Sequence, residues 1–167
     1  IETVSIESTK IGTNTFGAGQ AGIVSITGSV IDITGASQIE SNTFAEGNAG
    51  DLLLTGGIVS LSDSNVSAIS HDGASGAAGG IFVKGGTITV NVGGTLDTTT
   101  SSIDGSNSAA NISLEATQRI SLNGAVISAD TFGAASAGNV LLSAPDILLA
   151  NNTSILSGTV GAATGDA

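Results

Sequence analysis

The stretch ISADTFGAASAGN at residues 127–139 decides the fold, because close relatives of it recur along the chain. Residues 39–51 read IESNTFAEGNAGD, and residues 11–22 read IGTNTFGAGQAG. The Thr-Phe dipeptide inside the phrase returns at intervals of roughly 28 residues or multiples of that length, which is the signature of a repeat architecture.

The repeat can be written out over the whole sequence. A glycine closes each copy of the phrase, with Ala110 standing in for one of them; these glycines are Gly22, Gly50, Gly80, Gly138 and Gly165. The count gives units of about 27–30 residues: 1–22, 23–50, 51–80, 81–110, 111–138 and 139–167. We interpret residues 1–167 as a single repeat domain that is a piece of a longer repeat protein.

Each unit contains three short segments in which apolar and polar residues alternate. In unit 111–138, Ile112 and Leu114 share one face of the first segment, Ile120 and Leu122 share one face of the second, and Ile127 lies in the third. Alternation of this kind is typical of half-buried strands. Three strands per unit, joined by Gly, Asn and Ser corners, predict an all-β parallel β-helix of about six turns in which stacked turns bury a continuous apolar column.

Stacking turns equivalent positions into columns. The expected core column is Ile11, Ile39, Ile69, Leu96, Ile127 and Ile155. Beyond it we expect a polar column of Asn14, Asn42, Asp72, Thr99, Asp130 and Gly158, a hydroxyl column of Thr15, Thr43, Gly73, Thr100, Thr131 and Thr159, and a third column of Phe16, Phe44, Ala74, Ser101, Phe132 and Val160. The hydroxyls are expected to donate to the neighbouring turn, and Phe16 is expected to stack on Phe44. The alternatives are a water-ordering face for the hydroxyl column and a sugar platform for the aromatic one, although such a platform would call for Trp or Tyr.

Charge and composition exclude several classes of partner. The chain has 3 Lys+Arg against 14 Asp+Glu, a net charge of -11, so we expect neither nucleic acid nor an anionic membrane surface as a partner. There is no Cys, so neither a disulfide framework nor a thiolate metal site is expected. No apolar run approaches the roughly 20 residues that span a bilayer, so membrane insertion is not expected.

The sequence does not nominate an active site. Lys10 and Lys84 look isolated, Arg119 has only Glu115 nearby in sequence, and His71 is expected to be a solvated surface residue. No nucleophile, metalloprotease or phosphate-binding motif occurs. We therefore predict no enzyme, and no catalytic, cofactor-binding or metal-binding residue. Two departures from the repeat, at 62–68 and 101–110, are expected insertions, and inserted loops on a solenoid often carry binding.

The pattern xISAxTFGxxxAGNVxL at 126–142, echoed at 38–54, resembles the repeats of filamentous-haemagglutinin-like exoproteins, especially their cyanobacterial arrays. The resemblance covers the whole chain and is weakest at 81–110. It implies a right-handed β-helix in a secreted, surface-associated rod that is exported by two-partner secretion and often serves as an adhesin. The secretion domain of that family is not in this sequence.

Our first hypothesis is therefore a structural and adhesive stalk of an extracellular filamentous protein. Its expected partners are neighbouring repeats of the same protein, further rods through end-to-end or lateral association, and a host or surface glycan. The alternatives are a carbohydrate-processing β-helix, which a convergent group of acids around 97–104 would favour, and an ice-binding solenoid, which a flat double Thr ladder would favour.

Overall fold

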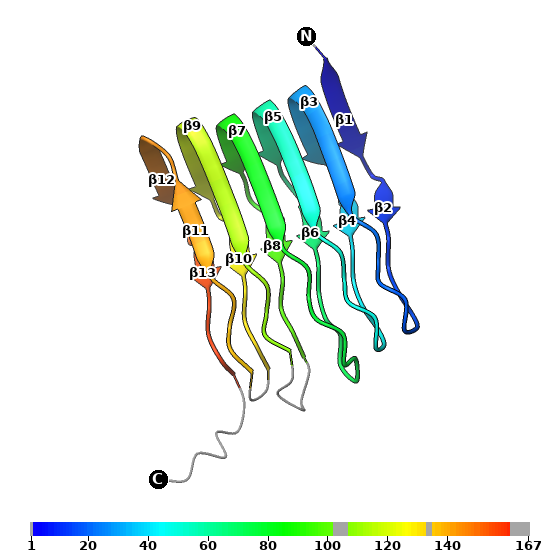
Figure 1. Cartoon of the computed structure of the whole chain (residues 1–167). Coiled ribbons are helices and arrows are strands. Elements are labelled where there is room, and N and C mark those ends of the chain that lie inside the picture. Colours follow the sequence, from blue (N-terminus) through cyan, green and yellow to red (C-terminus); the bar gives the residue numbers. More distant parts are fainter. Residues whose placement is uncertain (1, 102–106, 133–134, 161–167) are drawn as a thin grey trace, which may run out of the picture.

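The central turns of the chain each consist of a long strand, a short strand and a loop, and successive turns lie side by side (Figure 1). The computed structural model describes residues 2–101, 107–132 and 135–160, which form a parallel β-solenoid of about five turns. The predicted all-β parallel β-helix is confirmed. None of the described residues builds a helix long and apolar enough to cross a membrane. Gly165 and part of the second expected insertion, 102–106, lie outside the described residues.

Two parallel sheets run along the solenoid. Sheet A consists of β1 (Thr3–Glu7), β3 (Val24–Thr34), β5 (Leu52–Leu61), β7 (Ile81–Val90), β9 (Ile112–Asn123), β11 (Val140–Ser143) and β12 (Asp146–Ala150). Sheet B consists of β2 (Lys10–Gly12), β4 (Gln38–Glu40), β6 (Ser64–Ser67), β8 (Gly94–Asp97), β10 (Val126–Ser128) and β13 (Ser154–Leu156). In both sheets each strand pairs with the equivalent strand of the next turn, so the backbone hydrogen bonds run along the solenoid axis.

The three expected segments per turn are present, but the first two usually form one strand. In β9, for example, the predicted segments at 111–116 and 119–124 join into a single strand that stays paired with β7 throughout, apart from a bulge after Gly85. Only in the last turn do they separate, as β11 and β12. A glycine lies at the bend of the long strands β3, β5 and β7, where a strand can turn without losing its partners.

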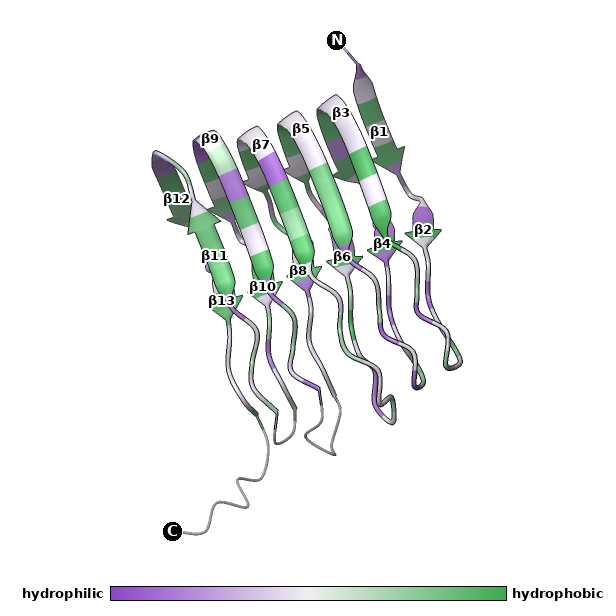
Figure 2. Cartoon of the chain, in the orientation of Figure 1, coloured by the Kyte–Doolittle hydropathy of each residue, from purple (hydrophilic) through white to green (hydrophobic). Residues whose placement is uncertain are grey.

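The core is a set of aliphatic columns enclosed by the two sheets. Ile39 and Ile127 are fully buried, as predicted, and so are Ile112, Leu114 and Ile120. Figure 2 shows hydrophobic residues concentrated along the strands and mixed or polar residues in the loops. Each such aliphatic side chain contributes about 1.5–3 kcal/mol through burial, so the strand columns are the main source of stability.

The predicted register is wrong by a few residues in the third turn. Val66, not Ile69, pairs with Ile39 and Leu96 in the core column. Thr43 forms its isolated β-bridge with Ser70, not with Gly73. The column positions predicted for Asp72, Gly73 and Ala74 are therefore occupied by Ile69, Ser70 and His71. The two extra residues follow the short strand instead of preceding it, so the first insertion lies in the loop after Ser70. Similarly Gly79, not Gly80, lies over Gly50.

Candidate functional site: the loop layer

The loops between each strand of sheet B and the next strand of sheet A project together to one side (Figure 1). We call the stacked segments the loop layer. Its described residues are 13–22, 41–50, 68–79, 98–101, 107–110, 129–132, 135–138 and 157–160. The insertion expected at 62–68 lies instead in this layer, after Ser70, and so do the described residues of the second expected insertion, Ser101 and 107–110. The loop layer is therefore the part of the solenoid in which sequence and length vary most.

Within the loop layer the chain runs outward and then returns, and glycine lets the returning segments stack closely. A Cβ on Gly47 would come within 2.6 Å of the Gly19 carbonyl carbon, and closer still to its oxygen. A Cβ on Gly50 would meet the carbonyl group of Gly22 in the same way. Side chains larger than hydrogen cannot fit at these positions. The repeated glycines of the TFxxGxAG phrase are thus a packing requirement of the returning segment.

Buried hydroxyl groups tie the outward segment to the returning one. Thr15 Oγ1 donates to the Gly19 carbonyl (2.5 Å), Ser70 Oγ donates to the Gly76 carbonyl (2.6 Å), and Thr43 Oγ1 donates to the Gly47 carbonyl. These bonds close each loop on itself, so the expected donation to the neighbouring turn is wrong for Thr15 and Thr43, and Ser70, which takes the place predicted for Gly73, also bonds within its own loop. Because the hydroxyl column is buried from Thr15 through Thr131, it presents no water-ordering face.

Asn and Asp side chains connect one turn to the next. The backbone N–H of Asn42 donates to Asn14 Oδ1 (2.8 Å), and the backbone N–H of Ile69 donates to Asn42 Oδ1 (2.8 Å). Farther along, the Gly158 N–H donates to Asp130 Oδ1 (2.7 Å). The expected polar column therefore works as a ladder of acceptors for backbone donors of the next turn.

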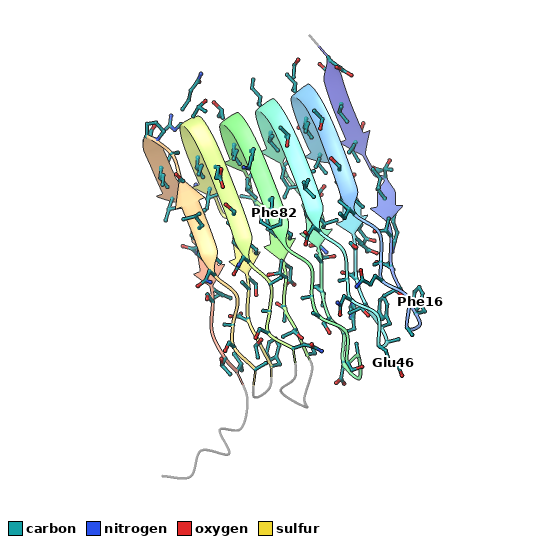
Figure 3. The ribbon with its side chains drawn as sticks, in the orientation of Figure 1. Phe16, Glu46 and Phe82 are labelled. Carbon is teal, nitrogen blue, oxygen red and sulfur yellow. The ribbon has the colours of Figure 1, made fainter. Side chains whose placement is uncertain are left out.

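An aromatic stack lies on the outer face of the loop layer. Phe16 and Phe44 stack with ring centroids 4.8 Å apart and an interplanar angle of 7°, as predicted. His71 continues the stack at 4.1 Å and 9° from Phe44. Figure 3 shows Phe16 in the first loop and Glu46 near the end of the next, with Phe82 away from both on sheet A.

His71 is not the freely solvated residue that the sequence suggested. Its ring is partly buried against Phe44, and Nε2 is buried without a hydrogen-bond partner. Burial lowers the pKa of His71 below its ordinary value, although the carboxylates of Glu40 and Asp97 act in the opposite direction. The ring is therefore neutral at neutral pH and serves as a third flat ring in the stack.

Each of the three basic residues is paired with an acid of the next turn. Lys10 Nζ lies 2.8 Å from Glu40, Lys84 Nζ lies 3.2 Å from Glu115, and Arg119 Nε lies 3.1 Å from Asp146. Lys10 and Lys84 are therefore not isolated, contrary to the prediction. Arg119 pairs with Asp146, whereas Glu115, its neighbour in sequence, pairs with Lys84. The sequence signal that indicates these ion pairs is their spacing, because the two members of each pair are separated by about one repeat.

Glu40 is the most enclosed of these acids. Burial raises its pKa, but the hydrogen bond from Asn14 Nδ2 (3.0 Å) and the ion pair with Lys10 outweigh burial, so the pKa of Glu40 lies below its ordinary value. The carboxylate is ionised, and its Oε2 atom contacts both Asn14 and Lys10 of the preceding turn, so it links the two turns.

The described residues offer no group of three or more His, Asp or Glu side chains that could hold a metal ion. The acids expected to converge around 97–104 are only partly described: Asp97 accepts from the Thr99 N–H (2.8 Å), and Asp104 lies outside the described residues. At the Lys84–Glu115 pair there is a shallow, open depression that includes Ser143.

Comparison with known proteins gives no relative for this chain, because no family model, no curated protein and no solved structure matches it significantly.

Proposed function

We propose that the chain is a structural repeat stalk of a secreted or cell-surface filamentous protein, whose loop layer supplies adhesive contacts. The finer resemblance to filamentous-haemagglutinin-like exoproteins, with export by two-partner secretion, belongs to the same proposal. The observation that carries it is the pairing of strands with their equivalents in the next turn throughout both sheets, in a register that holds apart from the bulge after Gly85. Hydrogen bonds of the sheets, the Asn ladder and the ion pairs all join neighbouring turns, so the molecule resists bending and can lengthen by adding turns.

Dispersed polar side chains also support a structural role. Catalysis needs several groups that converge on one reacting atom, whereas Lys10, Lys84 and Arg119 each hold an acid at a different place along the solenoid. These three ion pairs thus join neighbouring turns of the solenoid.

Electron microscopy of the native protein at the surface of its source cells tests the proposal. Antibodies raised against this chain should label extended rods or fibres outside the cell. Label confined to the cell interior, or polysaccharide cleavage by the purified protein, would replace the stalk with another function.

A further inference from the structure

The outer face of the loop layer carries a stripe parallel to the solenoid axis, in which four exposed apolar side chains are divided into two pairs by His71 and Ser101. We define the stripe as the residues that come directly after the bridged hydroxyl residues in sequence: Phe16, Phe44, His71, Ser101, Phe132 and Val160. Phe16 is 75% exposed, Phe44 40%, Phe132 45% and Val160 53%. Phe16 therefore buries little of its ring, and exposed apolar patches of this kind mark interaction sites.

Carboxylates flank the stripe. Glu46 and Asp72 are exposed just beyond Phe44 and His71 along their loops, while Glu40 and Asp97 act on His71 from the side of sheet B. Lys10, the basic residue nearest to the stripe in sequence, is already held by Glu40. With a net charge of -11, a second copy of the chain would bring like charges together. The charge pattern favours a cationic partner.

We propose that this stripe binds a basic amphipathic α-helix of a protein partner. This inference rests on the proposed adhesive function and names the class of its partner. Turns of the solenoid are about 4.8 Å apart, and turns of a helix are about 5.4 Å apart. Because these two spacings are similar, a helix that lies along the stripe places about one helical turn over each residue of the stripe. The whole stripe spans roughly 24 Å at that spacing, which matches a helix of about 16 residues.

The two ends of the stripe would anchor the helix. Apolar helix side chains pack against Phe16 and Phe44 at one end and against Phe132 and Val160 at the other. His71 and Ser101 separate the two anchors and tolerate a polar residue between them. Lys or Arg side chains at the edges of the helix can lay their methylene stems on the exposed rings and place their charges near Glu46 and Asp72.

Binding of designed peptides to the whole chain tests the proposal. One peptide has 18 residues of Leu and Lys with Leu on a single helical face; a second has the same composition in an order that destroys the face. Calorimetry should show that the amphipathic peptide binds at least tenfold more tightly, and circular dichroism should show that it becomes helical on binding. Equal affinity of the two peptides would mean attraction by charge alone and would overturn the proposal.

Variants locate the binding surface. The double change Phe16→Ser and Phe132→Ser should weaken binding of the amphipathic peptide at least tenfold. Val92→Ser is the matched control, because Val92 is 66% exposed in the turn between β7 and β8, and it should leave affinity unchanged. Unfolding curves show whether each variant is folded; if the double variant unfolds, Phe16→Ser alone replaces it, with the same requirement of weaker binding.

Two other outcomes have definite meanings. Unchanged affinity in a folded Phe variant refutes the stripe as the binding surface. Binding of a neutral oligosaccharide that depends on Phe16, without binding of the peptide, would assign the stripe to a glycan instead. Neither outcome affects the stalk, since electron microscopy of native material reports on rods independently of the stripe.

Discussion

Replacing Gly47 by Ala should destabilise the loop layer far more than an ordinary surface substitution. The added Cβ would lie within 2.6 Å of the Gly19 carbonyl carbon, and both partners are backbone atoms that cannot rotate away. Relief requires the second loop to move away from the first. That movement strains the hydrogen bonds from the Gly47 N–H to Gly17 (2.9 Å) and from the Phe44 N–H to Thr15 (3.0 Å). Overpacking costs about 1–3 kcal/mol, and two weakened hydrogen bonds cost about 1 kcal/mol each. The expected loss is about 3–5 kcal/mol of unfolding free energy.

The control is Gly19→Ala, one turn earlier in the same column. A Cβ on Gly19 meets nothing within 4 Å, and its backbone is not left-handed. The substitution should therefore be neutral or stabilise the fold by about 0.4–1 kcal/mol through the unfolded chain. Urea unfolding gives the free energies, and hydrogen exchange of residues 41–51 shows whether the loop opens locally. If the Gly47 variant is as stable and as protected as the Gly19 variant, the close-packing account of the repeated glycines is wrong.

Three further predictions concern the core and the titrating groups. Ile39→Ala should lower the unfolding free energy by about 2–5 kcal/mol, because Ile39 is fully buried; a loss below 1 kcal/mol in urea unfolding would contradict the core register. The lowered pKa of Glu40 means that its stabilisation is complete above its ordinary pKa of 4.5 and is lost as pH falls through its value in the folded chain. Thermal melts between pH 6 and 3 should show this loss, and Glu40→Gln should remove that part of the pH dependence. The pKa of His71 is also lowered, so its stabilisation is complete above the ordinary value of 6.5 and declines as pH falls below it. His71→Phe should keep the stack and flatten the melting temperature across that range, whereas an unchanged slope would exclude His71 as its source.

The repeat phrase was enough to predict the class of fold, because its spacing constrains every turn. Isoleucines such as Ile39 and Ile127 could be assigned to the core since alternation and stacking must agree there. The third turn was misread for a physical reason. Val66 and Ile69 are both aliphatic, and Ser70 replaces the usual threonine, so hydropathy alone did not distinguish two registers. Only the strand pairing places the two extra residues in the loop after Ser70.

The loop layer was less predictable than the strands, because its contacts join residues from different turns. The stacking of His71 on Phe44 depends on the corrected register. The ion pair of Lys10 with Glu40 likewise requires the two turns to be aligned before the residues become neighbours. The glycines were visible in sequence, but turn formation and close stacking both favour glycine. The position of Gly47 against a carbonyl group of the preceding turn decides between them.

A solenoid of this kind favours one style of recognition over another. Equivalent positions are displayed in lines about 4.8 Å apart, so a partner that reads one line makes the same weak contact several times. Avidity then grows with the number of turns without any single strong site. The Asn ladder and the paired cations join neighbouring turns, and the buried hydroxyls close each loop on itself. This leaves the exposed apolar stripe, with Glu46 and Asp72 beside it, as the surface free to vary. For a partner bound along the stripe, changes in affinity should therefore track the stripe residues, not the core.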